Sequence, residues 1–355
     1  MANTSDKLVI AGFRGGILTC TFEDGAACGL HFEGASGSLV GNVYAGRVKN
    51  IVKNLNAAFV DIGAPLPAFL DAVDAGAFRY ADGRQHDRLR EGDALIVKVK
   101  KDAQKTKGPS VTGRFRESGD PEILKKAEFV TAPALLKAAD PEWLFLARRF
   151  RKPDAEIVTD LPAVYEALTG SAPEEEAAYR QKLPERFRTE KPLKKASGTG
   201  VPVRFYSDRV LALSSVYSLE TVVSTALSRN VWLKSGGYLV IEQTEAMTVI
   251  DVNTGKTDRK GSKEDTIRRT DEEAADEIIR QLRLRNLSGI IVADFIDLHT
   301  KESQEALMER LKALAAADPV RTEIIDLTGL HLVEITRKKA GRPLKDLLSG
   351  KQISG

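Results

Sequence analysis

Two stretches decide the fold of this chain: MTVIDVN at residues 247–253 and IIVADFID at residues 290–297. In each, a short and mainly apolar run leads directly into an aspartate, Asp251 in the first and Asp294 in the second. Runs of this length and composition predict buried strands. The sequence therefore predicts two strands that each end at a carboxylate.

The segment between these strands predicts one helix, from Asp271 to Asn286. Thr270 is placed to cap this helix, and Glu273 completes the spacing of a capping box. A strand, a helix and a second strand form a crossover unit, which favours parallel, neighbouring strands. We therefore expect the two carboxylates to lie side by side. The apolar face of the helix consists of Ala275, Ile278, Ile279 and Leu282.

Two adjoining carboxylates repel each other and lose water, so a cation is usually needed between them. The expected ion is Mg²⁺, with Mn²⁺ as the alternative, because His299 has no thiol or second histidine beside it to indicate zinc. Asn253 would add a carbonyl oxygen or orient a phosphate. The simpler interpretation is that Asp251 and Asp294 only begin loops, and spacing alone leaves both interpretations open.

Composition bounds the class of protein. The chain has 355 residues, 42% of them hydrophobic, which is enough for about two to three modules. Its 53 basic and 50 acidic side chains give a net charge of only +3, so a nucleic-acid surface would have to come from local patches. No apolar run reaches about 18 residues and no signal peptide is recognisable, so we expect a cytoplasmic protein without membrane contact.

The amino-terminal part predicts a β-meander with strands at 8–11, 17–21 and 28–32. Cys20 and Cys28, the only cysteines, have only His31 close by in sequence, so they indicate a reduced, partly buried pair rather than a metal site.

Residues 41–111 predict a small barrel of the oligonucleotide-binding sort, because short strands alternate with glycine turns. Its aromatics and cations suit a single-strand binder, although the aromatics would equally fill the barrel and the lysines form a solvated face. The aromatics are Tyr44, Phe59, Phe69, Phe78 and Tyr80, and the cations include Arg47, Lys49, Lys53, Lys98, Lys100, Lys101, Lys105 and Lys107.

Further along, residues 132–150 have helical spacing and residues 186–197 form a basic, proline-broken linker. Thr300 is expected to cap a helix, and 322–327 and 331–336 are expected to be paired strands. A loop at 253–263 and a basic tail could each contact phosphate, or simply be solvated. The tail contains Arg337, Lys338, Lys339, Arg342 and Lys345.

The chain resembles the ribonuclease E/G family. The resemblance rests on MTVIDVNTGK at 247–256, the run from Gly261 to Leu298 and LVEITRKK at 332–339, together with GNVYAGRVKNIV at 41–52, AAFVDIG at 57–63 and AFL at 68–70. It covers 41–112 and roughly 132–344, and the unusual runs around both aspartates agree in order and spacing.

The resemblance implies an α/β fold with an RNase H-like and a DNase I-like catalytic region and an inserted S1 (OB-fold) β-barrel. The implied domains are 1–36 for the first RNase H-like part, 37–112 for the S1 domain, 113–131 for a remnant of the 5′-sensor region, 132–226 for the second RNase H-like part, 227–345 for the DNase I-like domain and 346–355 for a tail.

The resemblance also implies a magnesium-dependent endoribonuclease that cuts single-stranded, often A/U-rich RNA and leaves 5′-phosphate and 3′-hydroxyl ends. The implied metal ligands are Asp251 and Asp294, with Asn253 and Arg321 beside them in the catalytic centre. The implied RNA-binding residues are Phe59, Phe69 and Lys107.

Two departures qualify the resemblance. The family's zinc-sharing cysteine pair has no counterpart, because no cysteine follows Cys28, so no zinc and no zinc-linked dimer are expected and the oligomeric state stays open. Residues 113–131 are far shorter than the family's 5′-sensor domain, so sensing of the 5′ end is expected to be lost. The alternative function is a non-catalytic RNA-binding or ribosome-associated protein on the same fold, and a DNA nuclease is a weaker third.

Overall fold

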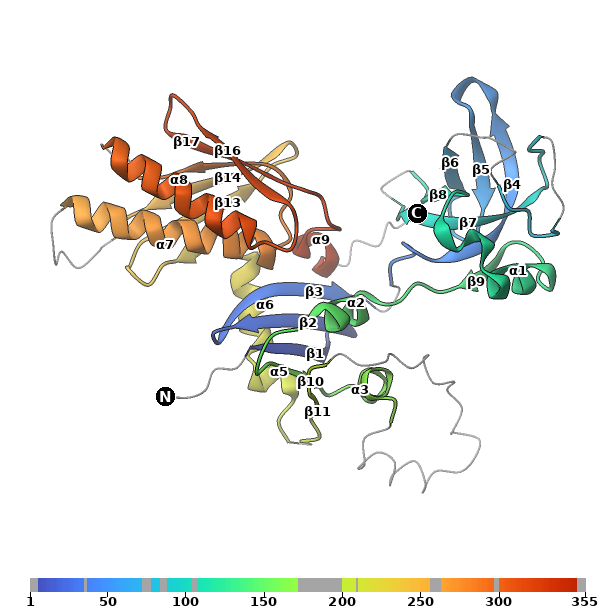
Figure 1. Cartoon of the computed structure of the whole chain (residues 1–355), viewed down its shortest axis with the longest axis horizontal. Coiled ribbons are helices and arrows are strands. Elements are labelled where there is room, and N and C mark those ends of the chain that lie inside the picture. The colour runs from blue at the N-terminus through green and yellow to red at the C-terminus, as the bar shows by residue number, and fades with distance from the viewer. Residues whose placement is uncertain are drawn as a thin grey trace. The chain divides into compact units, whose positions relative to one another are not determined.

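The computed structural model describes residues 6–34, 37–71, 78–83, 88–103, 107–171, 200–208, 210–255, 263–296 and 300–349. The linker expected at 186–197, His299, and Lys256, Arg259 and Lys260 of the expected 253–263 loop lie outside the described residues. The chain divides into two compact units (Figure 1). One, the barrel unit, runs from 36 to 141, and the other, the larger unit, combines 1–35 with 142–351.

The barrel unit confirms the predicted small β-barrel. Its sheet has the order β5-β6-β8-β7-β4-β9, and an additional pairing of β5 with β4 closes the barrel. Side chains such as Val60, Leu70 and Leu95 fill its core. The strands are β4 (Val43–Val52), β5 (Ala57–Asp61), β6 (Ala68–Asp71), β7 (Ala94–Lys101), β8 (Ser110–Thr112) and β9 (Ala134–Lys137), and two short helices, η3 (Arg116–Gly119) and α1 (Pro121–Glu128), lie between β8 and β9.

The helix expected over 132–150 is only partly correct. Residues Ala134–Lys137 form strand β9, which pairs with β4, and helix α2 is confined to Glu142–Arg149. Leu135 is 43% exposed and Leu136 only 5%, an alternation that belongs to a strand at the barrel surface. The segment after residue 131, expected to begin the second RNase H-like part, therefore starts inside the barrel unit, and the named domain limits remain a prediction.

The larger unit contains two sheets. The first has the order β11-β10-β1-β2-β3, in which β1, β2 and β3 form the predicted antiparallel meander and β10 runs parallel to β1. Side chains alternate along β1, so that Leu8 packs among residues of α2 and α3 while Val9 packs among residues of α5 and α6. The elements are β1 (Lys7–Phe13), β2 (Gly16–Glu23), β3 (Ala26–Glu33), β10 (Glu156–Thr159), α3 (Pro162–Thr169), β11 (Val203–Phe205), α5 (Leu213–Val216) and α6 (Leu219–Leu227).

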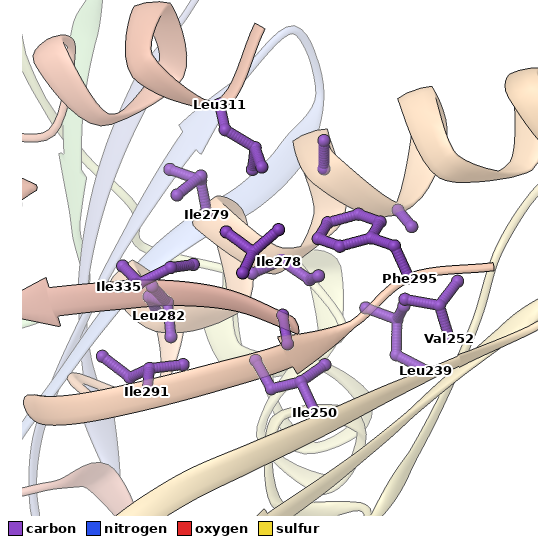
Figure 2. Packing of buried hydrophobic residues seen from close by; sticks show 14 of the residues in the cluster. Leu239, Ile250, Val252, Ile278, Ile279, Leu282, Ile291, Phe295, Leu311 and Ile335 are labelled. Atoms are coloured by element: carbon purple, nitrogen blue, oxygen red, sulfur yellow. The ribbon is translucent and has the colours of Figure 1, made fainter. Parts of the chain in front are cut away.

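The second sheet has six strands in the order β12-β13-β14-β15-β17-β16. Helices α7 and α8 cover one face, where Ile250 and Ile291 of the sheet meet Ile278 of α7 (Figure 2). The opposite face, called here the open face, carries half-exposed apolar side chains such as Ile290. The elements are β12 (Asn230–Trp232), β13 (Tyr238–Gln243), β14 (Met247–Asn253), α7 (Lys263–Leu284), β15 (Gly289–Asp294), α8 (Lys301–Ala316), β16 (Thr322–Leu327), β17 (Leu332–Arg337) and α9 (Leu344–Leu348).

The predicted start of the crossover helix is wrong. Helix α7 begins at Lys263, and Thr270 is a buried residue inside it whose hydroxyl donates to the carbonyl of Thr266 at 2.9 Å. Glu273 accepts hydrogen bonds from the backbone N–H groups of Lys234 and Ser235, at 2.5 and 2.9 Å. Thr270 and Glu273 have the spacing of a capping box, but they lie inside the helix. Both side chains bind other partners there and do not cap the helix. Thr300 does cap α8, accepting from the N–H of Ser303.

Arg337 was expected in a solvated tail, and this is also wrong. It ends β17, is 4% exposed, and its Nε lies 2.8 Å from Oδ2 of Asp318. It also donates to the carbonyl of Leu287 at 2.9 Å. Val333, Ile335 and Arg337 alternate as the buried residues of β17, so the arginine lies on the core side of the sheet. Its ion pair and hydrogen bonds offset the cost of burying the charge. The expected pairing of the last two strands is confirmed.

The cysteines are free and buried, as expected for a reduced pair. Burial raises the pKa of both thiols, that of Cys28 to about 12, so neither is a ready nucleophile or metal ligand.

Candidate active site

The candidate site lies at the carboxyl ends of β14 and β15. These strands run parallel, and their register makes Asp251 and Asp294 direct partners, as the sequence predicts. Both aspartates are exposed, whereas Ile250 and Ala293, one position back on each strand, are fully buried under α7 and α8. Because side chains alternate across a strand, both carboxylates lie on the open face, about 4.8 Å apart in backbone position.

The charges of the two groups are coupled. Burial, and then the negative charge of Asp251, raise the pKa of Asp294 above its usual range. The amide nitrogen of Asn253 donates to Oδ2 of Asp251 at 2.8 Å, so these two side chains form one polar cluster. A bound cation would relieve the repulsion between the carboxylates.

The donor set fits Mg²⁺ or a similar hard ion. Such ions bind through one or two carboxylates and keep several water ligands, so two aspartates suffice. In the part of the chain that the structure describes, no cluster of three or more histidine, cysteine or acidic side chains is arranged to hold a metal.

A third acid, Asp271, was not predicted from the sequence, and it contacts the backbone that follows Asp294. Asp271 of α7 is 1% exposed, and its Oδ1 accepts a hydrogen bond of 3.1 Å from the N–H of Ile296, two residues past Asp294. Its Oδ2 is buried and has no partner among the residues that the structure describes, and burial raises its pKa to about 7. Its position within a charged helical segment, where acidic residues are usually solvated, gave no signal of this role.

Arg321 does not join the cluster. It precedes β16, whose first residue Thr322 pairs with Arg337, and Arg337 in turn pairs with Gly289 at the start of β15. Asp294 is at the other end of β15, about 17 Å along the strand. Arg321 is largely exposed and pairs with Glu323 at 2.7 Å. Register therefore places Arg321 near the opposite end of β15 from Asp294, and not beside Asp251 and Asp294 as expected.

Within the barrel unit, Phe59 and Phe69 face each other across β5 and β6. Their rings lie 5.9 Å apart in an edge-to-face arrangement, and both are partly exposed, whereas Phe78 and Tyr80 are buried in the core. Lys107 is exposed two residues before Pro109, whose carbonyl accepts from the N–H of Phe69. The structure thus separates surface aromatics from those that fill the barrel.

The residues that the structure describes include no helix that combines the length and apolar character needed to cross a membrane.

Comparison with known proteins agrees with the geometry. A model described as the ribonuclease E/G family matches residues 121–340. Ribonuclease G of Escherichia coli K12 is 30% identical over 90% of this chain and 77% of its own length, and ribonuclease G of Haemophilus influenzae is 31% identical over 92% and 78%. Ribonuclease E of a Nostoc species is 30% identical over 87% of this chain, which spans about half (52%) of that relative.

Proposed function

This chain belongs to the ribonuclease E/G family, and on that premise we propose that it is a magnesium-dependent endoribonuclease acting on single-stranded RNA. The proposed products carry 5′-phosphate and 3′-hydroxyl ends. The observation that carries the proposal is the parallel register that sets Asp251 beside Asp294 on the open face.

We assign Asp251 and Asp294 to hold the cation, with Mn²⁺ as a possible substitute for Mg²⁺. The ion, when bound, lowers the pKa of a coordinated water and neutralises charge on the scissile phosphate. Asn253 orients the carboxylate of Asp251 through its 2.8 Å hydrogen bond and is placed to orient the phosphate as well. The support for this assignment is the register that makes Asp251 and Asp294 direct partners. It agrees with the raised pKa of Asp294, which comes first from burial and then from the negative charge of Asp251.

We assign Phe59 and Phe69 to base stacking and Lys107 to phosphate contact. Partly exposed aromatic faces can stack on unpaired bases, which would give a preference for single strands. The cytoplasmic location, the loss of 5′-end sensing and the named domain limits remain predictions of the sequence.

The test is RNA cleavage by the purified chain in Mg²⁺ and in EDTA, with the variants Asp251→Asn and Asp294→Asn. Each variant keeps the side-chain shape but removes a metal-binding charge, so cleavage should fall to the EDTA level while RNA binding persists. Asp326→Asn is the matched control, because Asp326 is an exposed carboxylate on β16 of the same sheet. Product ends should accept a radioactive 5′ phosphate only after phosphatase treatment.

Three outcomes would contradict the proposal. Wild-type rates for Asp251→Asn in Mg²⁺ would show that the acid pair is not the metal site. RNA binding without cleavage by the wild type would favour the non-catalytic alternative. Equal cleavage of a matched DNA oligonucleotide would favour a DNA nuclease.

A further inference from the structure

An aromatic pair of an exposed tryptophan and a half-buried tyrosine lies on the open face beside the candidate active site. Trp232 of β12 is 71% exposed, and its ring centroid lies 5.2 Å from that of Tyr238 on β13. A tryptophan this exposed leaves a large apolar surface in water, and tryptophan and tyrosine are enriched at binding interfaces because each combines an apolar ring with a polar group.

Strand register connects this pair directly to Asn253, which forms the polar cluster with Asp251. Trp232 is the partner of Tyr238, and Tyr238 is the partner of Asn253. Partners across a sheet share a face, so both rings stand on the same side as Asn253 and Asp251. Trp232 is two strands from β14 and two residues along from Asp251, which places their backbones about 12 Å apart.

The hairpin that carries the rings is held in place on several sides. Glu273 of α7 accepts from the N–H groups of Lys234 and Ser235 in the turn between β12 and β13. A Cβ on Gly237 would come within 2.7 Å of the carbonyl oxygen of Asn253, so only glycine allows the turn to approach the catalytic strand this closely. The rings are therefore presented from a fixed backbone, which lowers the entropic cost of binding.

We propose that Trp232 and Tyr238 form a base-stacking platform for an unpaired nucleobase of the RNA, within a few nucleotides of the scissile phosphate. The exposed Lys234, in the adjoining turn, adds a cation for the backbone of the same strand. The inference rests on the proposed function, because the cation held by Asp251 and Asp294 defines where the phosphate is cut. We favour RNA over a protein partner because the rings are cross-strand neighbours of Asn253, which is proposed to orient the scissile phosphate.

The direct test uses the fluorescence of Trp232. The chain has two tryptophans, and the other, Trp143, is buried in the larger unit, so Trp143→Phe leaves Trp232 as the only reporter. In this background with Asp251→Asn to prevent cleavage, a short single-stranded oligonucleotide with Mg²⁺ should quench the emission. If folding suffers in this background, the difference between the wild type and Trp232→Phe gives the same signal.

The kinetic test compares Trp232→Ala with Trp232→Phe on a defined RNA. Loss of one stacked base should lower kcat/KM by about 5- to 150-fold, and phenylalanine should restore most of it. Ile325→Ala is the matched control, since Ile325 is a 52% exposed apolar residue on β16 of the same sheet. RNA substrates that lack one base near the cut extend this test. The difference in kcat/KM between Trp232→Ala and the wild type should vanish only when the missing base is the one that stacks on Trp232.

The two failures are distinguishable. Absence of any Mg²⁺-dependent cleavage by the wild type would overturn the proposed function itself. Normal cleavage by Trp232→Ala with no RNA-dependent quenching would overturn only the platform. Emission that changes with protein concentration, and not with RNA, would identify the aromatic pair as a contact between copies of this chain and would likewise overturn it.

Discussion

Replacement of Asp271 by asparagine should stabilise the larger unit at neutral and alkaline pH. This carboxyl is 1% exposed, and among the described residues its two oxygens have a single hydrogen-bond donor, the N–H of Ile296. Burial raises its pKa from 3.8 to about 7. The folded chain therefore binds this proton more tightly than the unfolded chain does.

The sign of the effect follows from that difference. Stability from the protonated carboxyl is complete below the ordinary aspartate pKa and is lost as pH rises through about 7. A rise of about three pKa units corresponds to about 4 kcal/mol in the free energy of unfolding. Asp271→Asn keeps an acceptor for Ile296 and removes the charge, so its advantage over wild type should grow by about this amount between pH 4 and 8.

Urea unfolding followed by tryptophan fluorescence measures this advantage, because Trp143 and Trp232 both lie in the larger unit. All other titrating groups are common to both proteins and cancel in the difference. Glu309→Gln, which neutralises an exposed carboxylate on α8, is the control and should show little pH-dependent difference. A difference between Asp271→Asn and wild type that is constant from pH 4 to 8 would refute the reasoning.

Two further predictions concern the barrel and the core. Phe59→Ala and Phe69→Ala should each weaken binding of single-stranded RNA by about 1–3 kcal/mol in an anisotropy titration. Phe129→Ala, at an 81% exposed position of the same unit, should not, and equal losses at all three positions would argue against a specific platform. Arg337→Ala should lower the free energy of unfolding by about 3–5 kcal/mol, because it leaves Asp318 buried and unpaired. Arg321→Ala, which breaks only an exposed pair, should cost less than about 1 kcal/mol in the same urea titration, and similar losses for both arginines would contradict the distinction.

The sequence predicts the site better than it predicts its surroundings. The short apolar runs before Asp251 and Asp294 are local signals of strands. A crossover connection favours parallel strands, so the sequence pattern is enough to predict that the two aspartates are neighbours. Arg337 was misjudged because its partner Asp318 lies 19 residues away, and such a pair leaves no periodic trace. Trp232 was missed although it alternates with the buried Val231, because a strand of three residues gives too little pattern to fix its exposed face.

The site and the core of the second sheet depend on the same connection. Of the pairings that the structure describes in this sheet, only that of β14 with β15 is parallel, and antiparallel neighbours would have put the two aspartates at opposite ends. Helix α7 makes the parallel pairing possible, and its apolar face covers Ile250 and Ile291 behind the aspartates. The same helix holds the loop after Asp294 through Asp271 and the turn after Trp232 through Glu273. A change that shifts α7 should therefore disturb the proposed metal binding and the proposed base stacking together, whereas replacement of Asp294 or Trp232 should leave the helix in place.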